Sequence, residues 1–140
     1  AQACGPGQLA VCFMDLDGFK QINDTEGHDA GDEVLRIVAR RLTTQARETD
    51  CVARMGGDEF VLLLGELASA NDALQAMQRC LASICQPIRL ENGATVQVGA
   101  SIGIALNSAR ENTTQLLQRA DEAMYAAKRA GKGRVVVAGG

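Results

Sequence analysis

Four acidic side chains occur in two pairs that could bind divalent metal ions. Asp15 and Asp17 follow a continuous apolar run, and Asp58 and Glu59 follow two glycines between two short apolar segments. Mg²⁺ prefers hard oxygen ligands and commonly shares its coordination shell with phosphate oxygens. Two such ions can stabilise the attacking and leaving oxygens of a phosphoryl transfer. Either pair alone is more simply explained as ordinary turn residues, but four acids converging from adjacent elements favour a metal-dependent site.

The elements that position these acids can be predicted from hydrophobic periodicity. The predicted strands cover residues 9–14, 51–55, 60–64, 96–104 and 135–137, and the predicted helices cover 19–25, 31–47, a segment from Ser69 or Asn71 to before Pro87, and 113–130. The first strand reads as buried on both faces. In the strand at 96–104, apolar residues alternate strictly with small or polar residues, which predicts a strand with one buried face. The strands at 51–55 and 60–64 must pair as an antiparallel hairpin, with Gly56 and Gly57 in the turn.

This order predicts an α+β fold in which helices flank a mostly antiparallel central sheet. It contains the βαββαβ core of the ferredoxin-like superfold, which polymerase palms and nucleotide cyclases share. A fold alone implies no function. The length of 140 residues fits one domain, residues 1–140.

Composition excludes several classes of protein. The formal charge of −3 argues against nucleic-acid binding. No apolar run approaches the length of a membrane span and no signal peptide is recognisable, so we expect a cytoplasmic domain without direct membrane contact, although the full-length protein could be membrane-anchored. The five cysteines have no CxxC spacing, which disfavours a disulfide framework or a zinc site and favours buried free thiols; they are Cys4, Cys12, Cys51, Cys80 and Cys85.

Several segments resemble one known family. Residues 56–60 read GGDEF, residues 15–24 resemble the pattern DxDxFKxxND, residues 27–32 match GHxxGD, and residues 120–128 are similar to ADxAxYxAK. All four occur in the family's order and cover nearly the whole chain. The sequence is therefore identified as a member of the GGDEF family of diguanylate cyclases. The resemblance implies an enzyme that joins two GTP molecules into cyclic di-GMP with Mg²⁺, or with Mn²⁺ in its place.

The resemblance also implies roles for individual residues. Asp15, Asp58 and the backbone carbonyl of Leu16 match metal ligands, and Glu59 is assigned a metal or general-base role; Asp58 and Glu59 are the catalytic candidates. The remaining candidates match substrate positions: Asn23 and Asp32 for guanine, His28 beside the substrate, Gly56 and Gly57 under the nucleotide, and Lys20, Lys128 and Lys132 for phosphates. His28 could instead be an ordinary polar residue at a helix start.

Two departures from the family pattern bear on function. Lys132 stands where the family usually has arginine, so the bidentate phosphate geometry of a guanidinium is lost. The family's DxLTxLxNR helix does not precede the first strand, so we expect the fragment to lack that helix.

Arg47 and Asp50 precede the GGDEF segment at the spacing of the family's RxxD inhibitory site, which binds the product. The resemblance therefore implies feedback inhibition. The alternative is a simple i,i+3 ion pair at the end of a helix. The resemblance also implies a homodimer, because each subunit would present one GTP to the other.

Two rival functions remain open at this point. A GGDEF-like module could bind GTP or cyclic di-GMP as a sensor without making the product, although the retained Asp15, Asp58 and Glu59 argue against it. A mononucleotide cyclase or polymerase relative could use the same core, but Asn23 and Asp32 disfavour it.

Overall fold

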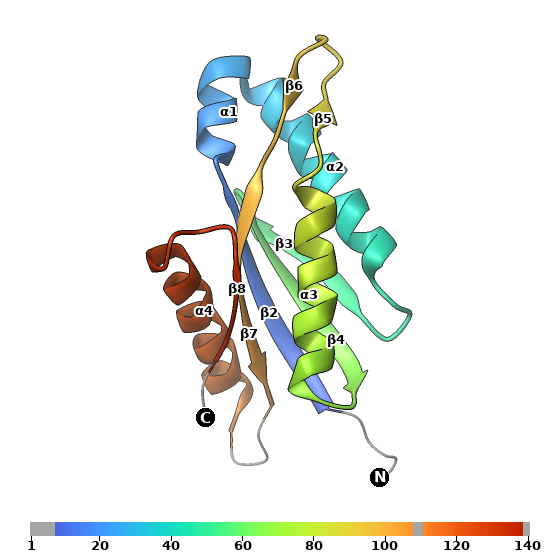
Figure 1. Ribbon diagram of the computed structural model, residues 1–140, viewed down its shortest axis with the longest axis vertical. Coiled ribbons are helices and arrows are strands. Elements are labelled where there is room, and N and C mark those ends of the chain that lie inside the picture. The colour runs from blue at the N-terminus through green and yellow to red at the C-terminus, as the bar shows by residue number, and fades with distance from the viewer. Residues whose placement is uncertain (1–7, 108–110, 139–140) are drawn as a thin grey trace.

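The computed structural model describes residues 8–107 and 111–138 (Figure 1). Its centre is a five-stranded sheet in the order β3-β4-β2-β7-β8. The strands are β2 (Gln8–Asp17), β3 (Cys51–Gly56), β4 (Glu59–Leu67), β7 (Gly99–Leu106) and β8 (Val135–Val137). β2 is antiparallel to both neighbours, β4 and β7, and only β8 runs parallel to its partner. The predicted α+β fold with a mostly antiparallel sheet is confirmed.

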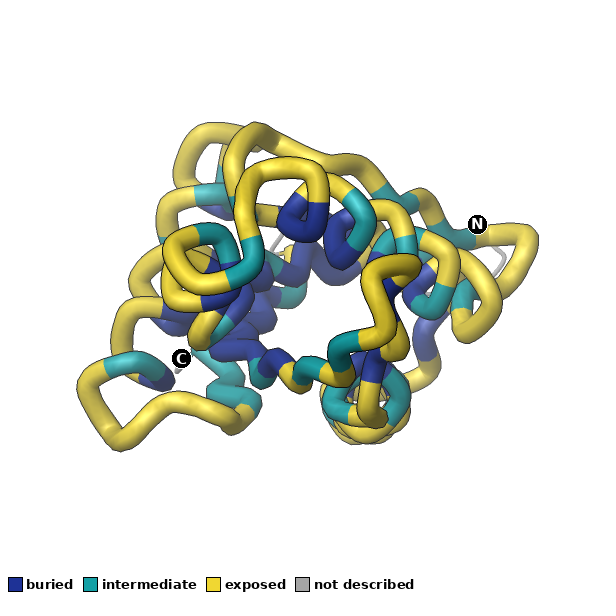
Figure 2. Tube along the Cα trace, turned by 90° about the horizontal axis from the view of Figure 1, so that it is seen from above, coloured by how far each residue is buried: buried dark blue, intermediate teal, exposed yellow. Residues whose placement is uncertain are grey.

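Helices cover both faces of the sheet (Figure 1). They are α1 (Phe19–Glu26), α2 (His28–Gln45), α3 (Ala70–Ile84) and α4 (Thr113–Arg129). The main core joins α2 and α3 to one face, and a smaller cluster including Val11, Ala105 and Ala120 joins α4 to the other. Figure 2 shows the buried residues gathered between these layers. β2 is therefore covered on both sides, as its continuous apolar run predicts.

The prediction of a half-buried strand at 96–104 is wrong. β7 begins only at Gly99, and its residues 100–105 are all buried. The face with Ser101 and Gly103 reads as exposed in the sequence but packs against α4. A Cβ on Gly103 would lie 2.1 Å from the backbone nitrogen of Met124 and 2.3 Å from the carbonyl oxygen of Ala120. The small residues of this face mark close helix packing, not solvent exposure.

The structure also contains a hairpin that periodicity did not predict. β5 (Ile88–Arg89) and β6 (Thr95–Val96) form a separate two-stranded sheet around a turn that contains Asn92 and Gly93. Strands of two residues are too short to show alternation. α2 also begins three residues earlier than predicted, directly after Gly27, and ends at Gln45, so Arg47 lies in the following loop.

Buried free thiols are confirmed for Cys12 and Cys80, and no disulfide joins the cysteines within the described ranges. Burial raises the pKa of Cys80 to about 11, and that of Cys12 further. The prediction is wrong for Cys51, which is exposed on the edge strand β3, and Cys85 is only half-buried. Cys4 lies outside the described residues. In the described part of the chain, no helix is long and apolar enough to cross a bilayer.

Candidate active site

The end of β2 lies beside the glycine hairpin because β2 and β4 are paired. Asp15 stands opposite Glu59 in the register, and the backbone nitrogen of Leu16 donates to the carbonyl oxygen of Asp58 over 3.1 Å. Residues 42 or more positions apart in the chain therefore meet at one point. The structure thus brings together the acidic residues that the sequence analysis selected from the two elements.

Asp15 is buried, and its two carboxylate oxygens have different surroundings. Oδ2 forms an ion pair with Nζ of Lys128, which comes from α4. Oδ1 is the only buried side-chain oxygen or nitrogen without a hydrogen-bond partner in the residues described here. A buried polar atom without a partner is costly, and such atoms often mark a missing ion or ligand. One oxygen of Asp15 is therefore available to a cation.

The negatively charged carboxylates around Asp15 repel one another. Burial and the charge of Asp15 raise the pKa of Asp58. Burial, followed by the charges of Asp15, Asp58 and Asp121, raises the pKa of Glu59. Burial opposes the charge on Lys128, but its hydrogen bond to Asp15 and the surrounding carboxylates outweigh that effect and raise its pKa. Additional positive charge would relieve this repulsion.

These donors fit a magnesium ion. Asp15 Oδ1 is available, Asp58 is adjacent, and the Leu16 carbonyl belongs to the same short segment. No group of three or more His, Cys, Asp or Glu side chains is arranged to hold a metal within residues 8–107 and 111–138. A bound ion would therefore take few protein ligands and depend on substrate oxygens, which is the usual manner of Mg²⁺.

Three lysines share a cavity with the metal candidates. The cavity has a volume of about 410 Å³, and Leu16, Asp58, Lys20, Lys128 and Lys132 are among its lining residues. Glu59 lines a neighbouring cavity of about 270 Å³ together with Asp121 and Met124. The structure therefore gathers the expected phosphate-binding lysines around Asp58, while Glu59 lines the neighbouring cavity.

The turn of the hairpin leaves space above its backbone. Gly56 and Gly57 have φ angles of +138° and +52°, which residues other than glycine rarely adopt. A Cβ on either residue would meet no protein atom within 4 Å. The protein needs both glycines for their conformation, and the open space is compatible with a ligand lying on the turn.

The guanine candidates lie where α1 and α2 cross. A Cβ on Gly31 would lie 1.8 Å from Oδ1 of Asn23, so Asn23 packs directly against the α2 backbone. Asp32, the next residue, is exposed and lines a cavity of about 390 Å³ with acidic neighbours such as Glu33. His28 is exposed at the first position of α2.

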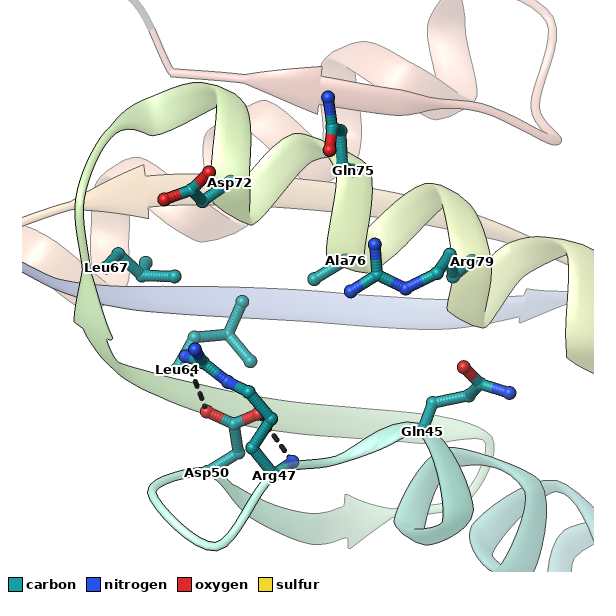
Figure 3. Close-up of a pocket in the computed structure, with 9 residues that line it drawn as sticks. All are labelled: Gln45, Arg47, Asp50, Leu64, Leu67, Asp72, Gln75, Ala76 and Arg79. Atoms are coloured by element: carbon teal, nitrogen blue, oxygen red, sulfur yellow. Dashed lines mark hydrogen bonds and ion pairs between the residues drawn. The ribbon is translucent and has the colours of Figure 1, made fainter.

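Arg47 and Asp50 form the ion pair of the alternative interpretation, in a loop that follows α2. The Arg47 side chain approaches Asp50 Oδ1 to 3.5 Å and donates to the Gly65 carbonyl over 2.6 Å. The pair also lines a cavity of about 270 Å³ between this loop and α3. Figure 3 shows Arg79 reaching toward this cavity from α3, opposite the pair.

Arg79 and the hydrogen-bond partners of Asp17 were missed in the sequence analysis of the site. Arg79 joins Arg47 only through the packing of α3, which residue spacing cannot reveal. Asp17 was recognised as one of four converging acids, but its side chain accepts hydrogen bonds from Ser101 and from the backbone of Gly133. Both partners are distant in the sequence and carry no signal of this role.

Comparisons with known proteins all indicate the same family. Residues 2–134 match the family model described as "Diguanylate cyclase, GGDEF domain". The chain is 53% identical over 127 residues to diguanylate cyclase TpbB of Pseudomonas aeruginosa, covering 90% of this chain and 29% of that protein. The chain thus spans less than a third of that relative.

Solved structures show the same similarity. The crystal structure of the GGDEF domain of TpbB from Pseudomonas aeruginosa superposes with a TM-score of 0.90 at 51% identity, covering 95% of this chain and 83% of that one. The GGDEF domain of DgcB from Caulobacter crescentus, in complex with c-di-GMP, gives a TM-score of 0.88 at 29% identity, with coverage of 94% and 78%.

Proposed function

The chain belongs to the GGDEF family of diguanylate cyclases, and we propose that it condenses two GTP molecules into cyclic di-GMP with release of two pyrophosphates. The observation that carries this proposal is the single cavity in which Leu16 and Asp58, beside the partnerless oxygen of Asp15, face three lysines. Carboxylates suit a divalent cation, and lysines suit a triphosphate. Their combination suits a metal-bound nucleoside triphosphate.

The proposed metal ligands are Asp15, Asp58 and the Leu16 carbonyl, with Glu59 as a further candidate. Mg²⁺, or Mn²⁺ in its place, would neutralise phosphate charge and lower the pKa of the attacking 3′-hydroxyl when bound. Lys20, Lys128 and Lys132, which line the same cavity, would orient the triphosphate. Most of the catalytic effect would then be positioning and charge neutralisation. Asp58 is also a candidate proton acceptor, but coordination to a cation would lower the basicity of its carboxylate, so activation of the hydroxyl by the metal would contribute more.

Selectivity for guanine would come from Asn23 and Asp32. The guanine edge carries N1–H and N2–H₂ donors, which a carboxylate can accept and which adenine does not present in that arrangement. Gly31 is packed against Asn23, so the orientation of Asn23 is fixed by the contact between α1 and α2. His28 would contribute from the start of α2, close to this crossing.

The product is a ring of two identical halves, so two active sites must face each other. A pair of domains related by a two-fold axis is the simplest arrangement that aligns two antiparallel nucleotides. Each domain would hold one GTP and present its α-phosphate to the 3′-hydroxyl on the other. A monomer would then turn over poorly, and the specific activity should rise with protein concentration.

We also propose feedback inhibition by cyclic di-GMP at the cavity of Arg47 and Asp50. Arg79 adds a second guanidinium to that cavity, and guanidinium groups bind phosphates bidentately and stack on bases. Asp50 already accepts hydrogen bonds from the backbones of Arg47 and Gly65. Arg47 is the more available of the two, since about half of its side chain is exposed.

The experiment is product analysis after incubation with GTP and Mg²⁺ across a range of protein concentrations, with ATP as the control substrate. Asp58→Ala should abolish formation of cyclic di-GMP, while Asp24→Ala, which removes a charge from the same cavity, should retain it in part. GTP binding without turnover at any concentration would support the alternative function, a sensor module. Turnover of ATP at the same rate would contradict the guanine assignment.

A further inference from the structure

Asp17 differs from the other acids of the site because its carboxylate is occupied by the protein itself. Ser101 Oγ lies 3.0 Å from Oδ1 and 3.1 Å from Oδ2, and the backbone nitrogen of Gly133 donates to Oδ2 over 2.9 Å. Ser101 is fully buried on β7. Asp17 therefore connects the end of β2 to a residue 116 positions later. Its oxygens are directed to these partners and not to the metal candidates.

The segment that Asp17 holds has an unusual backbone. Gly131, Lys132 and Gly133 have φ angles of +125°, +64° and +59° in succession. Lys132 is one of two residues other than glycine with positive φ in the described ranges. Such conformations cost free energy and persist only where surrounding contacts determine them. Lys132 N bonds the Ala127 carbonyl over 3.0 Å at the end of α4, and Gly133 N bonds Asp17, so the turn is fixed on both sides of Lys132.

The fixed residue lines the active-site cavity. Lys132 shares it with Asp17, Lys20, Lys128 and Asp58. Lysine has a flexible side chain and lacks the planar fork of arginine, so its contribution to phosphate binding depends strongly on where its backbone is held. The contact between Asp17 and Gly133 restrains the backbone directly after Lys132, the residue whose ammonium group would approach the cavity.

We propose that Asp17 is a positioning residue for nucleotide binding, which acts by holding the 131–134 turn so that Lys132 faces the triphosphate. The inference rests on the proposed function for its ligand, GTP. It assigns Asp17 no metal and no proton transfer. The effect of Asp17 on GTP affinity must then pass through Lys132, which a double-mutant cycle can measure.

The first measurement is amide hydrogen exchange of the 140-residue chain without nucleotide. Asp17→Ala should accelerate exchange in residues 131–134, because Gly133 N loses its acceptor. Asp17→Asn retains one carbonyl acceptor and should give an intermediate exchange rate in residues 131–134. This variant replaces Asp17→Ala in the comparison if the alanine variant is poorly folded. Asp24→Ala is the matched control, since it removes the same charge from the same cavity and touches no hydrogen bond of the turn. Unchanged exchange in both Asp17 variants would overturn the proposal.

The second measurement is the affinity for GTP in the presence of Mg²⁺. Asp17→Ala should weaken binding by roughly tenfold in the wild-type background, but should have little further effect in a Lys132→Ala background. An equal loss in both backgrounds would overturn the proposal, because Asp17 would then act independently of Lys132. If the unaltered chain bound no GTP, the proposed function would fail, while the exchange comparison would still decide whether Asp17 holds the turn.

Discussion

Substitution of Gly103 by alanine should push α4 away from the sheet and destabilise the fold. The added Cβ would lie 2.1 Å from the Met124 nitrogen and 2.7 Å from the Ala123 carbonyl carbon. Both atoms belong to helix backbone, which cannot rotate away as a side chain can. Ordinary contacts require more than 3.4 Å, so the helix must retreat by over 1 Å at this point. Ala120 and Ala127, both fully buried on α4, would lose packing as a result.

The expected cost is about 3 kcal/mol of unfolding free energy, the upper part of the range for overpacked cores. The better strand propensity of alanine offsets only about 0.5–1 kcal/mol. Gly99→Ala is the matched control on the same strand, because its Cβ would lie 3.6 Å from Asp17 Oδ2, an ordinary contact. Urea unfolding followed by circular dichroism measures both variants. Equal stabilities of the two variants would refute the packing argument.

Three further outcomes follow from the site and the core. Gly31→Ala should displace Asn23, whose Oδ1 would lie 1.8 Å from the new Cβ, and raise the KM for GTP by about tenfold; an unchanged KM would remove Asn23 from the guanine site. Arg47→Ala should weaken the inhibition of initial rates by added cyclic di-GMP, and undiminished inhibition would refute that assignment of the cavity. The folded-state pKa of Cys80 is raised from 9.0 to about 11, so its contribution to stability is complete below pH 9 and is lost as the pH rises toward 11. Cys80→Ala should therefore reduce the loss of stability between neutral pH and about pH 10 by on the order of 1 kcal/mol in urea unfolding, and an undiminished loss in this variant would contradict the argument.

The sequence predicted the elements that carry strong local signals. The apolar run before Asp15 and the glycines at 56 and 57 determined β2 and the hairpin, because a continuous apolar strand and a Gly-Gly turn have few alternatives. That prediction alone was enough to expect the two acidic pairs close to each other. The final strand, β8, was also predicted within its bounds.

Features that depend on tertiary packing were not predictable in the same way. Ser101 and Gly103 look like a solvent-facing set in the sequence, and only the position of α4 makes them interior residues. The ion pair between Lys128 and Asp15 joins residues 113 positions apart, and the resemblance to the family suggested phosphate as the partner of Lys128, not Asp15. Arg41 donates to the carbonyls of Ser83, Ile84, Gln86 and Pro87, and so caps α3 from α2 without any local signal.

The ammonium group of Lys128 supplies the buried carboxylate of Asp15 with a counter-ion from the same chain. A buried carboxylate without a counter-ion destabilises the folded state or becomes protonated. A cation that belongs to the same chain removes much of this cost without the entropy loss that binding a free ion involves. Under the proposed function, folding of this domain would therefore not require a divalent ion, although an ion bound beside the partnerless oxygen of Asp15 would add stability. On the same proposal, nucleotide binding would be an exchange of partners, in which Lys128 leaves Asp15 for the incoming phosphates. Chelating agents should then stop turnover while leaving the domain folded, as circular dichroism would measure.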